Sequence, residues 1–590
     1  MSARTITEVL FEHGRVHPDR PCLRFHRDGR WQDLPWGRVT ERTRAIAGGL
    51  AEAGISIGDR VAIVSRNRPE WALADLGSIA AGAVVATVYP TLPPDETAFI
   101  LAHCGARAAF VEDAEQLDKI LSVRDRLPRL ETVVLLDESA PPSSGAVPLA
   151  ALEAGASPAA AAARVEKAHA LGREAPLTVV YTSGTTGVPK GAVLSHGNVL
   201  CVIESVLEAL GDASRLRLNL SFLPLAHALE RIAGHYMPMY LGRTIAYARS
   251  LDTVAEDFRT IRPDYAVAVP RVFEKVAARI LGEVAGKPPA VRALFGWALA
   301  AGTRRSELDE RGAPIPALVR VRCVLADALV LRRVRARFGG RLKLFVSGGA
   351  PLAADVARLF HACGILVCEG WGATETAAPA TWNTPRAFRF GSVGRPLPGI
   401  EVRIATDGEL EVRGPNVFKG YLDNPQETAD AFTPDGFWRS GDIGGVDGDG
   451  FFHITDRKKE LVILASGKNI APAKVENLLR QRPLISNCMV HGDRRPYLVA
   501  AITLDRAELA ARRPELAAAP IVDARLREAV AAEVEAVNPH LARFEQVKRF
   551  ALVEPDFTPE GGELTLTLKL KRRVILERHR SALDALYEAP

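Results

Sequence analysis

The sequence predicts an α/β protein with a large N-terminal region of parallel α/β sheets plus a β-rich subdomain, and a small C-terminal α+β domain. Its 590 residues are 47% hydrophobic and 25% charged, which is typical of a globular protein with a large buried core. In the first half, apolar β-branched runs alternate with alanine- and leucine-rich stretches. After residue 380, short alternating segments carry Gly and Asp turns. These two textures predict two kinds of sheet.

The first cycle of strand, helix and strand lies near the N-terminus. VAIVS (61–65) predicts a buried strand, residues 71–82 a helix and residues 83–90 a second strand. A further cycle extends to the strand expected at 131–139. Because strands that alternate with helices form βαβ units, we expect a parallel sheet with helices on both faces.

Two segments interrupt this alternation. Residues 140–175 form a connection rich in Pro, Ser and Ala, in which the alanine run 159–163 predicts a surface helix. Residues 282–338 predict a long helical insertion rich in Arg, Ala and Leu. We interpret the basic face of this insertion as solvated surface rather than as a recognition patch.

The last third is predicted to contain antiparallel hairpins and then a mixed segment. Residues 401–414 and 444–456 alternate around Gly and Asp turns, which indicates hairpins. From residue 460 onward the pattern predicts an α+β unit. Its helices are expected at KVENLLRQ and RLREAVAAEVEAV, its strands at SNCMVHG and YLVAAITL, and the basic end KRRVILERHR could be a surface strand.

Charge and cysteine usage exclude several classes of protein. The net charge of +5, from 75 basic and 70 acidic residues, gives no nucleic-acid footprint. The start has no apolar signal-peptide core, and no apolar run is long enough to cross a bilayer. Seven cysteines without a CxxC pair predict reduced thiols in a cytoplasmic protein. Peripheral membrane contact through the basic C-terminal end and a homo-oligomer stay open.

The strongest motif is TVVYTSGTTGVPKGAVLSH, residues 178–196. A β-rich run leads into a loop of glycines and hydroxyls, whose backbone N–H groups can cradle polyphosphate. The loop is not a Walker A motif, because Pro189 precedes Lys190 and Gly191 follows it. A P-loop phosphotransferase is therefore disfavoured.

This loop resembles the phosphate-binding signature of the AMP-forming adenylating superfamily, which contains acyl-CoA synthetases, peptide-synthetase adenylation domains and luciferases. Further blocks follow in the order of the superfamily, so the resemblance covers nearly the whole chain: SGGAPL (347–352), EGWGATET (369–376), GELEVRGP (408–415), WRSGDI (438–443), TDRKKELVILASGKNIAPAKVE (455–476) and LTLTLKLKRR (564–573). The wording YPTLPPDE, SFLPLAHALER and VPRVFEKV is most similar to long-chain fatty acyl-CoA synthetases.

The resemblance implies ATP-dependent activation of long-chain fatty acids to acyl-CoA through an acyl-adenylate, with release of AMP and pyrophosphate. ATP, Mg²⁺ and CoA are the implied cofactors and co-substrates. A fatty acyl-AMP ligase that loads a carrier protein is the alternative, and GKNIAPAKVE favours CoA. A non-catalytic nucleotide-binding protein is disfavoured because the polar residues of the motifs are present. The implied domains are 1–458, which holds the ATP and acyl sites, and the mobile 459–590.

The resemblance also assigns roles to residues around the nucleotide. Glu375 would hold Mg²⁺, with Thr182 as a weaker ligand; Trp371 would stack on adenine, Asp442 would accept both ribose hydroxyls, and Arg457 would add a ribose or phosphate contact. Gly349, Ala350 and Pro351 would form one wall of the adenine slot. The remaining implied nucleotide- or CoA-binding positions are Ser183, Gly184, Thr185, Thr186, Lys190, Glu369, Gly370, Gly372, Thr374 and Lys468.

The acyl site, the catalytic lysine and the hinge complete the implied site. His227 would lie beside the reacting carboxylate, His235 is a weaker candidate, and Arg231 falls near the expected gate of an acyl tunnel. Lys569 is the implied catalytic lysine, although Leu568 stands where the superfamily usually has Gly and Lys571 lies two residues on. The hinge is expected at Lys459.

Overall fold

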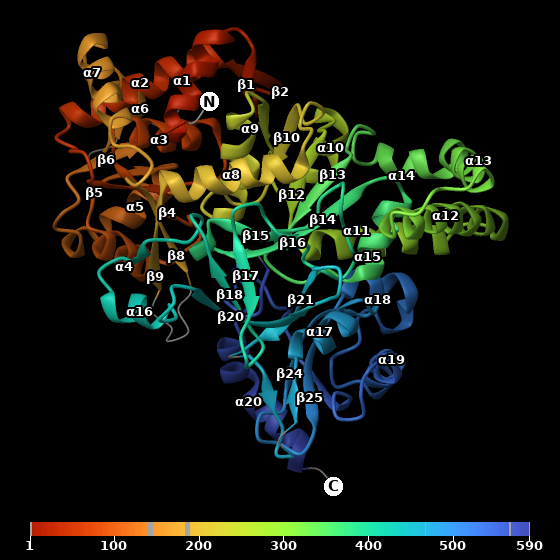
Figure 1. Cartoon of the computed structure of the whole chain (residues 1–590). Helices are drawn as coiled ribbons and strands as arrows, with labels where there is room; N and C mark the ends of the chain where they lie inside the picture. Colours follow the sequence, from red (N-terminus) through yellow and green to blue (C-terminus); the bar gives the residue numbers. More distant parts are fainter. Residues whose placement is uncertain are drawn as a thin grey trace.

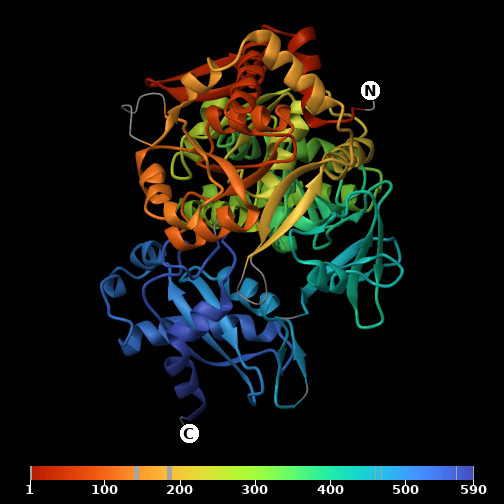
Figure 2. The same ribbon diagram turned by 90° about the vertical axis from the view of Figure 1, so that its left-hand side faces the viewer.

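The computed structural model describes residues 3–137, 145–182, 189–458, 460–466, 468–565 and 568–588. An N-terminal region with two large sheets and a smaller β-subdomain lies above a C-terminal domain, drawn in blue in Figures 1 and 2. The α/β fold class expected from the sequence is confirmed, with antiparallel strands added at the edges of both large sheets.

The first large sheet has eight strands among the described residues, in the order β19-β9-β8-β4-β3-β5-β6-β7. Its strands are β3 (Arg60–Val64), β4 (Val84–Val88), β5 (Ala106–Val111), β6 (Thr132–Leu135), β7 (Val147–Pro148), β8 (Pro176–Thr182), β9 (Lys190–Ser195) and β19 (Gly420–Tyr421). The six strands β8-β4-β3-β5-β6-β7 of this order run parallel to their neighbours. The helices α3 (Pro69–Ala80), α4 (Pro94–Cys104) and α5 (Ala114–Leu121) provide crossovers between β3, β4, β5 and β6. Strand β9 turns back antiparallel on β8.

The second large sheet has nine strands in the described part, in the order β16-β15-β14-β13-β12-β10-β11-β1-β2. They are β1 (Pro21–Arg27), β2 (Arg30–Pro35), β10 (Leu218–Ser221), β11 (Thr244–Tyr247), β12 (Tyr265–Ala268), β13 (Leu344–Ser347), β14 (Leu366–Ala373), β15 (Ala378–Trp382) and β16 (Arg395–Pro396). Its helices include α8 (His196–Leu210), α10 (Val254–Ile261), α11 (Pro270–Ala285) and α15 (Ala354–Ala362). One hydrophobic core joins both large sheets.

Helices near the N-terminus cover one end of this core. They are α1 (Ile6–Val16), α2 (Trp36–Glu52) and α7 (Pro158–His169). The alanine run forms α7, as predicted, but the helix is more than surface: Ala161 and Val165 are buried. A Cβ at Gly48 of α2 would lie 2.7 Å from the Cβ of Ala161, so α7 packs closely on α2.

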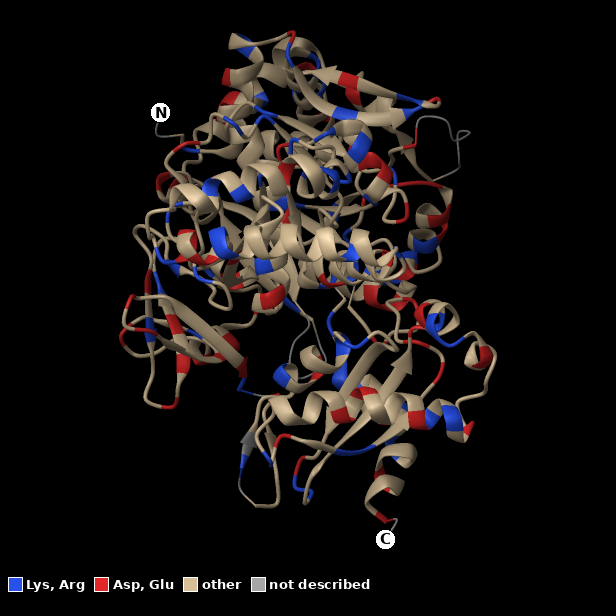
Figure 3. Cartoon of the chain, turned by 90° about the vertical axis from the view of Figure 1, so that its right-hand side faces the viewer, with Lys and Arg blue, Asp and Glu red and all other residues tan. Residues whose placement is uncertain are grey.

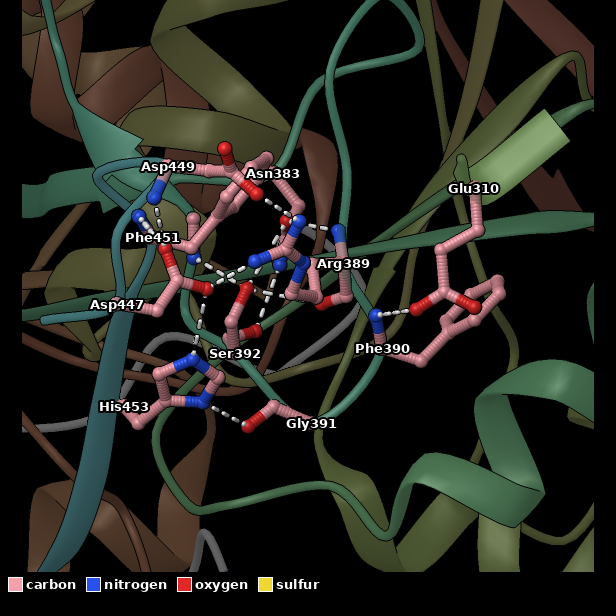
Figure 4. Close-up of polar contacts among 11 residues, drawn as sticks. Glu310, Asn383, Arg389, Phe390, Gly391, Ser392, Asp447, Asp449, Phe451 and His453 are labelled. Carbon is pink, nitrogen blue, oxygen red and sulfur yellow. Dashed lines mark hydrogen bonds and ion pairs between the residues drawn. The ribbon is translucent and has the colours of Figure 1, made fainter. Parts of the chain in front are cut away.

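The β-rich subdomain is a four-stranded antiparallel sheet of β17 (Glu401–Ile404), β18 (Glu409–Arg413), β20 (Trp438–Val446) and β21 (Phe452–Arg457), which confirms both predicted hairpins. Figure 4 shows that Arg389 forms ion pairs with Asp447 and Asp449, which lie in the turn between β20 and β21. His453 joins the same cluster through Asp447. The backbone N–H of Phe390 donates a hydrogen bond to Oε1 of Glu310, which lies in a helix of the insertion.

The helical insertion consists of α12 (Pro289–Glu310), α13 (Ala317–Ala326), a π-helical turn (Asp327–Leu331) and α14 (Arg332–Ala336). Phe295 and Ala298 of α12 pack with Cys323 and Ala326 of α13 in a separate small core. A Cβ on Gly302 would lie 2.3 Å from the carbonyl oxygen of Ala362, so glycine lets α12 approach α15. The insertion lies at the right-hand edge of the molecule in Figure 1.

The C-terminal domain has its own two cores around the sheet β24-β25-β26. Its elements are β22 (Val462–Ile463), β23 (Asn469–Ile470), α17 (Pro472–Arg480), β24 (Ile485–His491), β25 (Leu498–Leu504), α18 (Arg506–Arg512), α19 (Ala524–Val537), β26 (Val547–Leu552) and α20 (Arg572–Glu588). The expectation of a basic surface strand at the end is wrong. This segment is α20, because Ile575 and Leu583, two helical turns apart, are both buried on one face.

Among the described residues, no helix is long and apolar enough to cross a membrane. All seven cysteines are free thiols, and six of them are buried.

Candidate active site

The phosphate-loop motif spans two paired strands. Thr182, the last residue of β8, is in register with Lys190, the first residue of β9. The two residues therefore mark the mouth of the predicted loop. Ser183, Gly184, Thr185 and Thr186 lie outside the described residues.

Tyr421 links Lys190 to the predicted metal ligand. The Lys190 ammonium forms an ion pair with Glu427 of α16 (Pro425–Asp430) and lies 5.4 Å from the centre of the Tyr421 ring. The Tyr421 hydroxyl donates a 2.8 Å hydrogen bond to Oε1 of Glu375. Sequence reasoning missed Tyr421 and Glu427. The available signal was their place directly after the GELEVRGP block, at a helix start marked by Asn424 and Pro425.

Glu375 lies in a short 3₁₀ turn (Thr374–Thr376) that directly follows β14. Its side chain is nearly buried, and Tyr421 occupies one carboxylate oxygen. Mg²⁺ in nucleotide sites is usually held by one or two carboxylates together with substrate phosphates and waters. A single positioned carboxylate near a phosphate loop fits that donor set. Within the described ranges, no group of three His, Cys, Asp or Glu side chains forms a metal site by itself.

The predicted adenine wall is an exposed loop that a hydrogen bond to Glu369 holds in place. Gly349, Ala350 and Pro351 follow β13 and are exposed. Gly349 has φ +88°, which favours glycine. Glu369, on the neighbouring strand β14, is buried, and its Oε1 accepts a 2.9 Å hydrogen bond from the backbone N–H of Leu352. Burial raises the pKa of Glu369 to about 8. Glu369 thus positions the loop.

The glycines of the EGWGATET block allow β14 and β15 to pair closely. A Cβ on Gly372 would lie 2.0 Å from the carbonyl oxygen of Ala378, and one on Gly370 would lie 3.0 Å from Cδ1 of Trp382. Thr374 is half-buried at the start of the 3₁₀ turn. These glycines shape the strand that carries Trp371.

Trp371, Asp442 and Arg457, each expected to contact the nucleotide, lie together and bind one another. The indole N–H of Trp371 donates a 2.7 Å hydrogen bond to Oδ2 of Asp442, and Nε of Arg457 lies 3.1 Å from Oδ1. Asp442 on β20 is in register with Arg457 on β21. Each carboxylate oxygen can accept a second hydrogen bond, so acceptor positions remain for ribose hydroxyls.

Lys569 reaches this cluster from the C-terminal domain. The charges of Arg457, Asp442 and Glu460 act on its ammonium, and burial together with Arg457 lowers its pKa to about 8. His227, across the site, has its pKa lowered to about 4 by burial and then by Lys569. Across the described residues, no hydrogen bond or ion pair engages the Lys569 ammonium.

The backbone around Lys569 is fixed by local contacts. Lys569 N–H donates to Oγ1 of Thr565, and Thr565 N–H donates back to the carbonyl oxygen of Lys569. Leu568 has φ +61°, in the left-handed region that favours glycine. Leu568 therefore adopts the backbone conformation for which the superfamily usually has Gly at this position. Lys571, the alternative candidate for the catalytic lysine, is exposed.

The residues on either side of the expected hinge are bound to different domains. Lys459 lies outside the described residues. Lys458 forms ion pairs with Asp407 and Glu409 of the N-terminal region. Glu460 forms an ion pair with Arg572 of the C-terminal domain. Lys468, further on, lies 5.9 Å from the ring centre of Phe544 within the C-terminal domain.

The histidine and arginine candidates for the acyl site differ in burial. His227 is half-buried, and its Nδ1 accepts a hydrogen bond from the backbone N–H of Leu229. His235 is fully buried in a π-helix (Glu230–Tyr236), where it contacts Tyr247. Arg231 is fixed in the core by Asp75 and by a 2.7 Å bond to Oγ1 of Thr178.

The family models match both domains. The AMP-binding enzyme model matches residues 10–422, and the model of the AMP-binding enzyme C-terminal domain matches residues 459–590. The chain belongs to the AMP-binding enzyme family. The resemblance to the adenylating superfamily is thereby confirmed.

This AMP-binding enzyme is similar to curated proteins over its full length. It is 36% identical to the long-chain-fatty-acid–CoA ligase FadD15 of Mycobacterium tuberculosis, covering 99% of this chain and 97% of that protein. It is 29% identical to the human long-chain-fatty-acid–CoA ligase ACSBG1, covering 99% and 85%.

Solved structures support the fold of this AMP-binding enzyme. The adenylation domain of the carboxylate reductase from Mycobacterium chelonae superposes with a TM-score of 0.74 at 24% identity, covering 99% of this chain and 90% of that domain. The anthranilate CoA ligase AuaEII, solved with anthranoyl-AMP, gives a TM-score of 0.73 at 20% identity, covering 98% and 97%.

Proposed function

We propose that the protein is an AMP-forming long-chain-fatty-acid–CoA ligase that acts through an acyl-adenylate. The observation that carries the proposal is the meeting of Lys569 with the Asp442 cluster and His227 between two domains of an AMP-binding enzyme. Full-length similarity to two long-chain-fatty-acid–CoA ligases supports the substrate class and the thioester product.

The chemistry of the first half-reaction accounts for the residue types. A fatty-acid carboxylate attacks the α-phosphorus of ATP, and pyrophosphate leaves, so two anions must approach each other. At neutral pH the Lys569 ammonium is mainly charged, since its pKa of about 8 lies above 7. We propose that it bridges the carboxylate and the α-phosphate while Asp442 and Arg457 hold the ribose.

Mg²⁺ would be held by Glu375, with Thr182 as a second candidate ligand, and would supply charge neutralisation at the β- and γ-phosphates when bound. Tyr421 orients Glu375 for this role through one carboxylate oxygen. Lys190 lies at the mouth of the phosphate loop, and its ammonium would reach a phosphate by leaving Glu427.

In the second half-reaction the CoA thiol attacks the acyl carbon of the adenylate, and AMP leaves. We propose that the C-terminal domain, residues 459–590, turns about Lys459 to withdraw Lys569 and to bring the GKNIAPAKVE segment with Lys468 toward CoA. The separate anchoring of Lys458 and Glu460 supports a pivot between them. Free, mainly buried thiols are in keeping with a reducing, cytoplasmic location.

The test is a product assay on the purified protein. Incubation with ATP, Mg²⁺, CoA and a series of fatty acids of increasing length should give acyl-CoA by mass spectrometry, with AMP and pyrophosphate in equal amounts. ADP and phosphate as products would contradict the proposal. Accumulation of acyl-AMP that CoA does not consume would favour the alternative, a fatty acyl-AMP ligase that loads a carrier protein.

A further inference from the structure

The outer face of α13 is apolar where a surface helix is normally polar. Its inner face already packs on α12 through Cys323 and Ala326. Four aliphatic side chains on the opposite face are nonetheless exposed: Leu318 by 62%, Val321 by 56%, Val324 by 68% and Leu325 by 50%. A contiguous exposed apolar face on a surface helix marks an interaction site.

Exposed apolar side chains concentrate in this insertion. Of the 19 large hydrophobic side chains recorded as exposed in the described part of the chain, eight lie between residues 289 and 331. They are Val291, Leu294, Trp297, Leu318, Val321, Val324, Leu325 and Leu329. The α12–α13 pair forms the edge of the molecule on the right of Figure 1, and Figure 3 shows the charged residues from that side.

Positive charge borders the apolar face of α13. At 3.6 residues per turn, Arg320 falls beside Val324 at one edge of the exposed face and Arg322 beside Leu318 at the other. No Asp or Glu occurs from Arg311 to Ala326. The first acidic residue, Asp327, is neutralised by an ion pair with Arg335.

From these contacts we propose that the outer face of α13 docks on a lipid bilayer with anionic headgroups. An apolar helical face bordered by arginines fits the plane between headgroups and acyl chains, with the aliphatic side chains inserted and the guanidinium groups among phosphates. A second copy of the chain fits less well, because a two-fold contact would place the same acid-free, arginine-bordered face against itself. This docking role is separate from the proposed reaction and does not depend on it.

The basic C-terminal end is a weaker lipid-binding candidate. Arg572 is engaged by Glu460 and Glu476, and Arg578 by Glu563. Arginines already neutralised by carboxylates attract anionic headgroups less than the acid-free border of α13 does.

The experiment is co-flotation of the full chain with vesicles, without ATP or CoA, so that its failure would leave the proposed reaction untouched. Vesicles of phosphatidylcholine mixed with phosphatidylglycerol should bind the protein at low salt, and phosphatidylcholine alone should bind it about tenfold or more weakly. The double variants Val321→Glu/Leu325→Glu and Arg320→Gln/Arg322→Gln should each weaken binding by about tenfold or more.

A matched control adds the same charge elsewhere. The double variant Leu251→Glu/Val522→Glu changes side chains that are 67% and 85% exposed and lie far from α13 in the sequence, and it should bind vesicles like the wild type. Circular dichroism checks that all variants are folded.

Three results would overturn the proposal. The first is a wild-type protein that does not float with anionic vesicles, and the second is equal binding by the Val321→Glu/Leu325→Glu variant and the control. The third is a dimer in light scattering that the same variant dissociates, because this would assign the face to a second copy.

Discussion

The two domains prepare the candidate active site in opposite ways. In the N-terminal region, polar groups are bonded to one another: Trp371 and Arg457 to Asp442, and Tyr421 to Glu375. The C-terminal domain contributes Lys569, whose backbone is fixed at Thr565 and whose ammonium has no hydrogen-bond or ion-pair partner among the described residues. In the proposed mechanism, the residues that would hold the nucleotide are therefore held by one another, whereas the charge that would join the two substrates comes from the C-terminal domain.

The largest expected effect is the loss of that charge. Lys569→Ala should slow acyl-AMP formation by a hundredfold or more, about 3 kcal/mol, because a contact made to both anions in the transition state is lost. Pyrophosphate release measures this step. Thioester formation from supplied acyl-AMP should be spared, and Lys571→Ala should behave like the wild type. Normal adenylation by Lys569→Ala would remove the contrast between the domains.

The next largest effect tests whether the C-terminal domain must move. Proline fixes φ near −65° and removes an N–H group. Lys459→Pro should therefore keep much of its acyl-AMP formation and lose roughly tenfold or more of its CoA-dependent step. The two half-reactions are measured separately, with Lys459→Ala as the control that keeps backbone freedom. Equal losses in both half-reactions would point to misfolding or a direct ligand contact.

A pH profile tests the proposed role of the Lys569 ammonium in adenylation. The pKa of Lys569 is lowered to about 8, so the group is charged below that pH and neutral above it. The value of kcat/KM for adenylation should fall by about tenfold per pH unit above 8. In Lys569→Arg this alkaline loss should disappear, because guanidinium stays charged. A wild-type profile that stays flat well above pH 8 would contradict the role.

The smallest expected effect probes the bonded cluster. Trp371→Phe keeps an aromatic face for adenine but removes the hydrogen bond to Asp442, and should raise KM for ATP about fivefold, near 1 kcal/mol. Trp382→Phe is the matched control, since it removes an indole bond to the carbonyl oxygen of Cys368 instead. It should affect thermal stability but not KM. An unchanged KM in Trp371→Phe would mean that Asp442 is positioned by Arg457 alone.

Much of the fold follows from local patterns in the sequence. The predicted strands of the first 139 residues depend on apolar runs, such as Val61 to Val64, and such patterns are set within one element. The hairpins 401–414 and 444–456 were predictable for the same reason, because their Gly and Asp turns are local. The motifs that carry Asp442 and Glu375 could also be recognised in the sequence, though not their partners.

Only the tertiary structure decided those partners. Lys190 and Glu427 are 237 residues apart, and Trp371 and Asp442 are 71 residues apart, so no local pattern joins them. The ending KRRVILERHR could be a surface strand by its sequence, but it forms a helix in which Ile575 and Leu583 are buried. Likewise the helical insertion could be predicted from composition, but which face of α13 stays exposed depends on where α12 covers it. The sequence determines what each segment can form, and packing between distant segments determines which side chains meet and which remain uncovered.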